Sequence, residues 1–183
     1  VPLGQTAPGA FMRLILQMIA NDLTPVPLLA ALKHPLSAGG DAPGRFRARV
    51  RQLELAILRG PRPGAGFKDL HLALGRRESA ADLKGWLREI ETSAKPLMAA
   101  LRSRDAPLKD LVDAHLAFAE ALATSDTERG AARLWHGDAG EALSDLFRDV
   151  LDGVTGLPSI RGADYPDLIE ALMADRVVRP RFG

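Results

Sequence analysis

The segment RFRARVRQLELAILR, residues 45–59, holds four arginines within seven positions. At 100° per residue, Arg45 and Arg49 lie along one line of a helix and Arg47 and Arg51 along another. Side chains of like charge this close repel one another unless solvent, an acidic surface or phosphate lies opposite. The spacing therefore indicates a basic helix that needs a negatively charged counterpart or water.

Phosphate is one such counterpart. Each DNA phosphate that an arginine neutralises releases counterions, so binding of this kind weakens steeply as salt rises. Few aromatic residues are interspersed, so stacking on single-stranded bases is not indicated. Two alternatives remain open, a solvated helix face and docking onto the acidic C-terminal third of the chain. The candidate residues for the phosphate backbone of double-stranded DNA are Arg45, Arg47, Arg49, Arg51, Arg59 and Arg62.

The formal net charge of +1 conceals two oppositely charged regions. Residues 45–88 contain eleven Lys and Arg and four Asp and Glu, an excess of seven positive charges. Residues 138–175 contain nine Asp and Glu and two Arg, an excess of seven negative charges. The chain therefore has one basic and one acidic region, which favours negatively charged partners for the basic region.

Other side chains that could carry chemistry give weaker signals. None of the histidines has a partner at metal-ligand spacing; they are His34, His71, His115 and His136. His115 falls on the apolar face of its expected helix and is interpreted as a packed, hydrogen-bonded core residue. His136, Asp138 and Glu141 could meet around a metal, but both carboxylates are already explained as a capping box. We therefore expect no metal site and no catalytic residue.

The remaining enzyme motifs are missing. The segment GPRPGAGF, residues 60–67, follows an expected helix rather than a strand and has no Lys-Ser or Lys-Thr, so it is interpreted as a linker. No serine stands in a nucleophile-elbow context. The chain has no cysteine, which excludes disulfides, thiolate zinc sites and iron–sulfur ligation by these residues.

Helical periodicity dominates the elements that must position these residues, and only 177–179 looks strand-like. Pro27 and Pro35 limit one short helix to about two turns, and Pro96 is expected to separate two others. Ser79 is expected to cap one helix and Asp138 another. The fold class predicted is an all-α, irregular bundle of seven to nine helices. The expected helices cover 9–20, 26–33, 45–59, 67–74, 79–93, 97–101 and 107–123, with two more after Asp138 and Asp164.

No segment indicates a membrane. The longest apolar run, residues 14–20, contains Gln17 and is too short to cross a bilayer, and no leader pattern opens the chain. Together with the lack of cysteine, this favours a cytoplasmic location. Because the chain begins at Val1 and stops after VVRPRFG, we expect it to be an internal fragment of a longer protein.

Three segments carry a resemblance to a known family. They are LLAALKHPL at 28–36, LELAILRGPR at 53–62 and VVRPRFG at 177–183. With the residues around them they resemble the middle of AddB, a subunit of the bacterial AddAB helicase–nuclease, in its alphaproteobacterial form. The resemblance covers most of the chain.

The resemblance implies a place within a larger complex that processes double-strand DNA breaks for recombination. Residues 1–176 resemble the helical insertion called 2B in UvrD-type helicases, and 177–183 would begin the return to the motor-like core. The partners implied are the AddA subunit and the remainder of AddB. ATP, magnesium and an iron–sulfur cluster are implied for the parent complex, with their binding residues outside this chain, so no catalytic residue is carried over.

Three hypotheses follow. The favoured one is a helical AddB region that supports DNA handling and subunit contacts without a catalytic site of its own. The second is a purely structural or protein-interaction module with no nucleic-acid role, in which the basic helix pairs with acids at 138–175 or with another subunit. The third, a free-standing helical enzyme, lacks any recognisable group of converging polar residues.

Overall fold

The computed structural model describes residues 1–59, 63–76, 81–154 and 156–178. Within these ranges the protein is all-helical, as predicted, and β-structure is limited to two isolated bridges, Pro2 with Val177 and Ala106 with Ile160. The helices are α1 (Ala7–Ala20), α2 (Pro25–Leu32), α3 (Pro43–Leu53), α4 (Gly66–Gly75), α5 (Ala81–Arg102), α6 (Leu108–Ala123), α7 (Gly130–Leu134), α8 (Gly137–Gly153) and α9 (Tyr165–Ala174). Shorter turns are η1 (Leu3–Gln5), η2 (Glu54–Leu58) and η4 (Gly162–Asp164).

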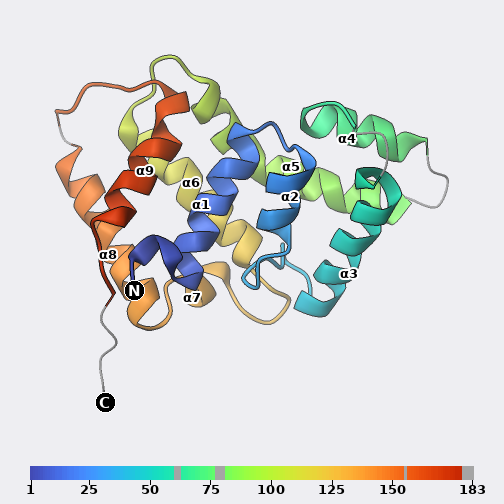
Figure 1. Cartoon of the computed structure of the whole chain (residues 1–183), viewed down its shortest axis with the longest axis horizontal. Coiled ribbons are helices and arrows are strands. Elements are labelled where there is room, and N and C mark those ends of the chain that lie inside the picture. The colour runs from blue at the N-terminus through green and yellow to red at the C-terminus, as the bar shows by residue number, and fades with distance from the viewer. Residues whose placement is uncertain (60–62, 77–80, 155, 179–183) are drawn as a thin grey trace.

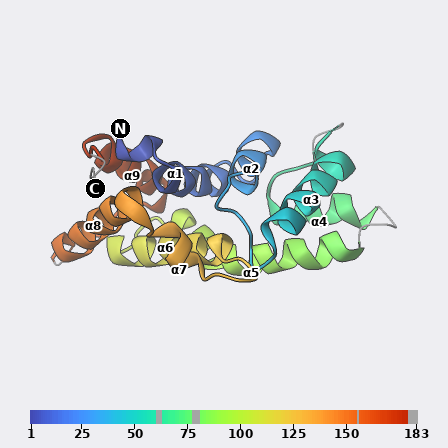
Figure 2. The ribbon, with the colours of Figure 1, turned by 90° about the horizontal axis from the view of Figure 1, so that it is seen from below.

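Helix α1 lies at the centre of the molecule and contacts α2, α5, α6, α8 and α9 (Figure 1). Seen from below, α1, α2 and α9 lie in one layer and α5, α6 and α8 in a second (Figure 2). This position explains why α1 is apolar on more than one side, with Phe11, Met12, Ile15 and Met18 fully buried. Its first turn is capped by Thr6, whose hydroxyl oxygen accepts a hydrogen bond from the Gly9 amide at 3.3 Å.

Helix α5 corrects the expectation that Pro96 ends a helix. It runs unbroken from Ala81 to Arg102 with Pro96 inside it. The carbonyl that loses its partner belongs to exposed Thr92, where water can bond it. Beyond the proline, Leu97 and Leu101 are 0% and 7% exposed. Burying two leucines contributes roughly 3–6 kcal/mol, against a cost of roughly 3 kcal/mol for an internal proline, so packing keeps the helix continuous. The predicted cap at Ser79 lies outside the described residues.

The basic helix expected at 45–59 is divided into two parts. Regular α-helix, α3, ends at Leu53, and the π-helical turn η2 continues to Leu58. At regular α-helical spacing Leu58 would fall on the line of Arg47 and Arg51. The wider π turn instead lets Ile57 and Leu58 both enter the core, at 7% and 9% exposure. The change of helix type thus keeps an apolar side chain off the basic face.

One further expectation, the helix cap at Asp138, is corrected by the structure. Helix α8 begins at Gly137, with His136 at the N-cap position and no side-chain cap bond, so Asp138 lies in the first turn rather than capping it. A carboxylate there is favoured by the helix dipole, which explains the same sequence signal differently. The short helix α7 was not predicted, because five residues are too few to show a period.

The two ends of the described chain lie side by side. The Leu3 amide donates to the Arg176 carbonyl at 2.8 Å, and the Val178 amide to the Val1 carbonyl at 2.9 Å. Val177 forms an isolated bridge with Pro2, and 179–183 lie outside the described residues. In the part of the chain that the structure describes, no helix combines the length and the apolar character that crossing a bilayer requires.

Candidate functional site

An open hollow on the surface of α3 is lined mostly by cationic side chains. Its volume is about 340 Å³. It is lined by Lys33, Arg47, Arg51, Glu54, Leu55 and Arg59, and we call it the basic hollow. Four of its six residues are cationic and one is anionic. Lys33 reaches it from the end of α2, while the other five come from α3, η2 and the residue that follows.

The predicted arginines do not act as one group, because α3 presents them on two sides. The buried stripe of α3 is formed by Phe46, Val50 and Leu53. At 100° per residue, the line of Arg45 and Arg49 lies on one side of this stripe and the line of Arg47 and Arg51 on the other. Only the second line faces the basic hollow.

The first line is neutralised by Asp41. Arg49 Nη1 lies 2.5 Å from one oxygen of this carboxylate, and Arg45 Nη1 lies 3.3 Å from the other. The Asp41 side chain is 10% exposed, so these contacts are partly shielded from solvent. Asp41 also precedes the first turn of α3, where the helix dipole stabilises a negative charge. Arg45 and Arg49 therefore have a structural partner within the chain.

Glu54 holds two cations at the edge of the basic hollow. Its carboxylate lies 2.7 Å from Lys33 Nζ and 3.2 Å from Arg59 Nη2. The pKa of Glu54 is lowered below its ordinary value, chiefly by the hydrogen bond from Lys33. Burial opposes this with the second largest effect, and the hydrogen bond from Arg59 adds a smaller lowering. Glu54 therefore compensates Lys33 and Arg59 in part, and among the described residues it is the one anionic group lining the hollow.

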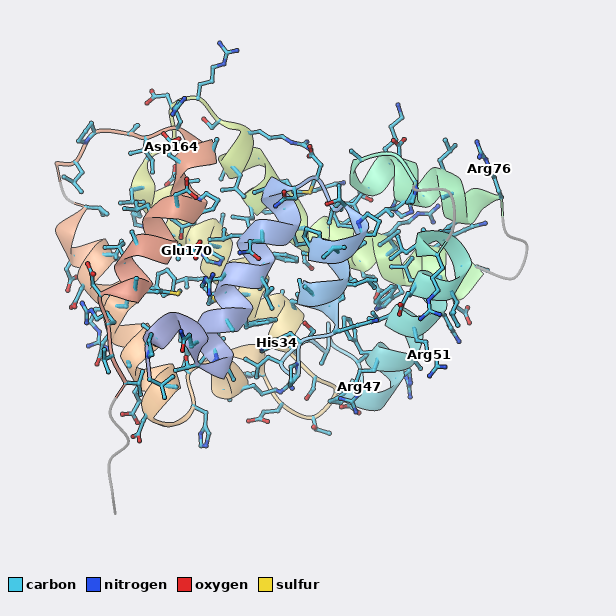
Figure 3. The ribbon with its side chains drawn as sticks, viewed as in Figure 1. His34, Arg47, Arg51, Arg76, Asp164 and Glu170 are labelled. Atoms are coloured by element: carbon cyan, nitrogen blue, oxygen red, sulfur yellow. The ribbon has the colours of Figure 1, made fainter. Side chains whose placement is uncertain are left out.

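Arg47 and Arg51 remain without a carboxylate partner among the described residues. Both side chains are exposed and project from α3 at the right-hand end of the molecule (Figure 3). They stand one helical turn apart, about 5–6 Å between Cβ atoms. These two arginines are the uncompensated charges of the site. The sixth predicted residue, Arg62, lies outside the described residues.

The acidic region lies at the other end of the molecule. Asp164 and Glu170 are found there, opposite Arg47 and Arg51 (Figure 3). Four acids of this region pair with nearer cations: Glu170 with Arg13, Asp149 with Arg176, Asp145 with Arg148 and Asp164 with Arg161. Among the described residues, no ion pair joins the arginines of α3 to acids between 145 and 175.

Sequence reasoning missed Lys33 and both carboxylate partners. Asp41 stands four residues before Arg45, the spacing of a helical ion pair, so the sequence held a usable signal for it. Lys33 is the C-cap residue of α2, and the packing of α2 beside α3 brings it to Glu54. No periodicity within either helix could have indicated that contact.

A second concentration of polar atoms lies in the core. His115 on α6 is completely buried, as predicted, and its ring bonds two other helices. Its Nδ1 lies 3.1 Å from Tyr165 Oη on α9, and its Nε2 lies 3.1 Å from the Met12 carbonyl oxygen on α1. A carbonyl only accepts, so Nε2 carries the proton and Nδ1 accepts from the tyrosine hydroxyl.

Burial sets the protonation of the trio formed by His115, Tyr165 and the Met12 carbonyl. It lowers the pKa of His115 to about 4, despite the opposing hydrogen bond to Met12. Burial likewise raises the pKa of Tyr165 above its ordinary value. At neutral pH both side chains are uncharged, and the ring of His115 also meets Phe147 edge-on at 5.9 Å. With every polar atom paired and no access for solvent, the trio serves stability.

Neither region forms a metal site. Among residues 1–59, 63–76, 81–154 and 156–178, no group of three or more His, Asp and Glu side chains could hold a metal ion. His136, Asp138 and Glu141 are thus not brought together as ligands. The Nε2 atom of His71 lies 2.8 Å from a carboxylate oxygen of Glu91 on the neighbouring helix α5.

Comparisons with known proteins give no assignment: no family model, curated protein or solved structure matches this chain.

Proposed function

We propose that this domain is a helical accessory region of an AddB-like subunit in a cytoplasmic helicase–nuclease, and that it contacts the phosphate backbone of double-stranded DNA through Arg47 and Arg51. It would support DNA handling and contacts with AddA and the rest of AddB, without catalysis of its own. The observation that carries the proposal is the pair of uncompensated arginines beside the basic hollow.

The spacing of this pair supports a backbone contact. The Cβ atoms of residues one helical turn apart lie about 5–6 Å from each other, and long arginine side chains can spread to the separation of successive phosphates. Lys33 and Arg59 add positive charge close by, held in place by Glu54. The π-helical turn η2 lies at the same place, and such turns occur frequently at functional sites.

The contact between the two ends of the described chain supports the placement as an insertion. Residues 1–3 and 176–178 lie together, so a longer chain could enter and leave this domain at one point. The domain would then project from the motor-like core as a helical arm, the role of a 2B-like region. ATP, magnesium and the iron–sulfur cluster would belong to other parts of the complex, since these residues contain no cysteine and the described ones no metal-holding group.

The test is duplex binding by the isolated domain, measured by fluorescence anisotropy of a labelled oligonucleotide over a range of salt concentrations. We expect weak binding independent of base sequence. The double variant Arg47→Gln/Arg51→Gln should lower the slope of log affinity against log salt by about 2, roughly one for each phosphate that is no longer neutralised.

The matched control is Arg148→Gln/Arg161→Gln, which removes the same charge from arginines paired locally at the acidic end. It should leave the salt slope almost unchanged. An equal fall in both variants would mean that net charge alone drives binding, and the assignment to Arg47 and Arg51 would be wrong.

A purely structural or protein-interaction role remains the second candidate. The version in which the basic helix docks onto acids of the same chain has little support, because Asp41 and Glu54 supply the contacts of α3 and η2. An acidic surface on another subunit would satisfy Arg47 and Arg51 equally well. Absence of duplex binding even at low salt would favour this second candidate.

A further inference from the structure

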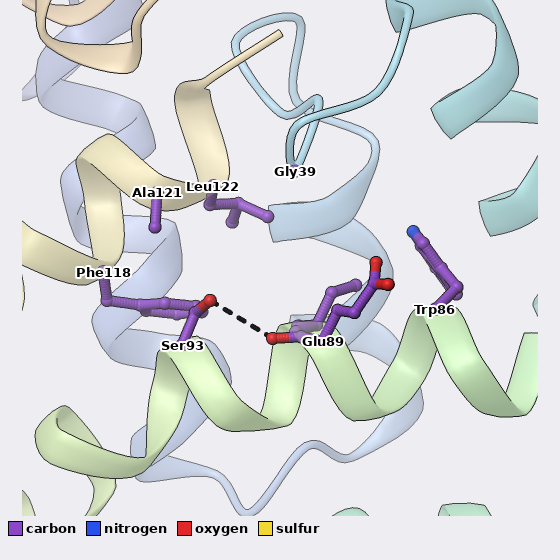
Figure 4. Close-up of a pocket in the computed structure, with 8 residues that line it drawn as sticks. Gly39, Trp86, Glu89, Ser93, Phe118, Ala121 and Leu122 are labelled. Atoms are coloured by element: carbon purple, nitrogen blue, oxygen red, sulfur yellow. Dashed lines mark hydrogen bonds between the residues drawn. The ribbon is translucent and has the colours of Figure 1, made fainter. Parts of the chain in front are cut away.

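Three hollows in the described part of the chain differ in the charge that they offer to a ligand. The hollow between α5 and α6 has a volume of about 40 Å³, and the Ser93 hydroxyl at its edge donates to the Glu89 carbonyl at 3.2 Å (Figure 4). A second hollow, of about 270 Å³, lies where α1 and α5 end, and Arg102 Nη2 lies 3.5 Å from Asp22 Oδ1 in its lining. The basic hollow, of about 340 Å³, combines a similar size with an excess of positive charge.

The cations of the basic hollow keep donors that a ligand could use. Lys33 and Arg59 are bound to Glu54, but Lys33 uses one of its three N–H donors for this carboxylate and Arg59 two of its five. Arg47 and Arg51 have no carboxylate partner among the described residues. With four cations and one anion, the lining has an excess of three positive charges.

The hollow brings these donors together from two directions. Lys33 reaches it from the end of α2, and Arg47 and Arg51 reach it from α3. Because Glu54 already fixes Lys33 and Arg59, these two side chains lose less freedom when a ligand binds. Arginines along a flat helix face would contact successive phosphates, whereas cations around a concave surface can converge on one anionic group. The arrangement therefore favours a single group with a high charge.

A phosphomonoester is a group of this kind. At pH 7 a terminal phosphate carries a charge of about −1.5 to −2 and has three strong acceptor oxygens. A phosphodiester within a DNA strand carries a single negative charge, and its remaining oxygens are esterified. A terminal phosphate can therefore accept hydrogen bonds from more of the converging donors and balance more of their charge.

The size and the apolar wall of the hollow indicate a nucleotide rather than a bare phosphate ion. Leu55, which is 53% exposed, also lines the hollow and offers an apolar surface on which a sugar ring can pack. A volume of about 340 Å³ lies at the lower end of the range of about 300–1,000 Å³ that is usual for small-molecule sites. A phosphate ion alone would leave most of this space to water.

We propose that the basic hollow binds the terminal phosphate of a nucleotide unit, a phosphomonoester at the end of a DNA strand or on a free nucleotide. Arg47, Arg51 and the remaining donors of Lys33 hold the phosphate, and Leu55 contacts the sugar. For a strand end the proposal rests on the duplex contact proposed above, whereas for a free nucleotide it does not.

The first experiment compares two short blunt duplexes of one sequence, with 5′-phosphate or 5′-hydroxyl ends, by fluorescence anisotropy. The phosphorylated duplex should bind about fivefold more tightly, the effect of one additional exposed ion pair. A hydroxyl-ended duplex lengthened by two base pairs carries the additional charge as diesters and should gain much less.

The pH dependence of this preference identifies the doubly charged phosphate. The second pKa of a phosphomonoester is about 6, so the preference should shrink toward equal binding between about pH 7.5 and about pH 5.5. The hollow itself keeps its charge in this range, because its cations are Lys and Arg and the pKa of Glu54 is lowered. Titration of His34 and His71 affects both duplexes alike and cancels in the ratio. Circular dichroism at each pH checks that the protein stays folded.

The second experiment tests the free nucleotide by isothermal titration calorimetry. Thymidine 5′-monophosphate should bind with a dissociation constant in the millimolar range, and its methyl diester about fivefold more weakly. A preference for the monoester in the duplex experiment alone identifies a strand end as the ligand, and a preference in both experiments includes free nucleotides. Equal binding of monoester and diester in both experiments would overturn the proposal.

A pair of lysine variants assigns the preference to the hollow. Lys33→Gln should reduce it to about twofold, since Lys33 takes part in the phosphomonoester site. Lys109→Gln, which removes a lysine similarly paired with Asp113 on α6, should leave it unchanged. An equal reduction by both variants, or none by Lys33→Gln, would overturn the assignment.

The outcomes also separate this proposal from the duplex contact. Equal affinity for both duplex ends and for both nucleotide probes, with a salt slope that still depends on Arg47 and Arg51, would overturn the phosphomonoester site and leave the duplex contact standing. If neither duplex binds, the duplex contact is wrong, and the nucleotide experiment decides whether the hollow binds a phosphomonoester.

Discussion

His115 and Tyr165 lie in the core between α1, α6 and α9, whereas Arg47 and Arg51 lie on the surface of α3 beside the basic hollow. In the core, every polar atom of the trio has a partner within about 3 Å and burial keeps both side chains uncharged. On α3, two permanent charges face solvent with no carboxylate opposite among the described residues. The core therefore contains paired, uncharged polar side chains, whereas the surface of α3 carries charged side chains that have no carboxylate partner among the described residues.

The difference separates groups that stabilise the fold from groups that remain available. Removing a paired, buried group leaves its partners unsatisfied, so the cost falls on folding. Removing an exposed, unpaired cation breaks no ion pair, so it should weaken binding to an anionic partner and leave the stability of the fold almost unchanged. The four predictions below test this contrast, beginning with the largest expected effect.

Replacing His115 with alanine should lower the free energy of unfolding by about 3–5 kcal/mol. The change opens a cavity and leaves the Tyr165 hydroxyl and the Met12 carbonyl unpaired. Urea denaturation near neutral pH measures it. The control His71→Ala, which breaks a half-buried contact with Glu91, should cost less than about 1 kcal/mol. Similar losses in both variants would contradict a structural role specific to His115.

Acidification should destabilise the protein through the same residue. The pKa of His115 is about 4 when folded and 6.5 ordinarily, so between these values the unfolded chain binds more protons. The contribution of His115 to the free energy of unfolding is fully present above pH 6.5 and is lost as the pH falls toward 4. The total loss is roughly 3 kcal/mol. Urea denaturation at a series of pH values measures this loss.

The control for acidification is His115→Asn, which keeps hydrogen-bonding groups but cannot titrate, and should lose most of the pH dependence. Burial also lowers the pKa of His34, so its share has the same sign. His34→Asn measures that share separately. A slope unchanged by His115→Asn would show that other groups cause the acid sensitivity.

Replacing Asp41 with asparagine should have a smaller effect on folding and an opposite effect on binding. Loss of the charge facing Arg45 and Arg49 should cost about 1 kcal/mol. It also releases both arginines, so affinity for duplex DNA should rise. Asp167→Asn makes the same change of net charge at an exposed residue of the acidic end. If it raises affinity equally, total charge rather than the release of two arginines explains the gain.

The smallest effect on stability is expected for Arg47→Gln/Arg51→Gln. Both side chains are exposed and have no ion-pair partner among the described residues, so the free energy of unfolding should change by less than about 0.5 kcal/mol. Arg49→Gln, which breaks the ion pair with Asp41, should cost about 0.5–1 kcal/mol. The contrast would fail if the double variant proved more destabilising than Arg49→Gln.

Prediction from the sequence succeeded where a helix repeats its apolar positions over several turns. The helix expected at 107–123 is found at Leu108–Ala123 with His115 buried on its apolar face. It failed at Pro96, because the local preference of proline was outweighed by burial of Leu97 and Leu101 against other helices. It also failed at Leu53, where the π-helical turn arises from the need to bury both Ile57 and Leu58.

The candidate site also has some features that the sequence indicates and others that only the packing of distant segments decides. A cluster of arginines is visible in the sequence, but its division into paired and unpaired lines depends on where Asp41 lies. The loop before α3 fixes that position. The contribution of Lys33 depends on the packing of α2 beside α3, which brings Lys33 to Glu54.

The amino-acid sequence by itself determined that this protein is helical, that His115 is a core residue and that positive charge gathers on one helix. These properties follow from side chains a few positions apart, whose relative directions the helical repeat fixes. The tertiary structure alone decided which charges are neutralised and which polar groups stay unpaired. Those outcomes depend on how distant segments pack together, and burial gives that packing its energetic weight.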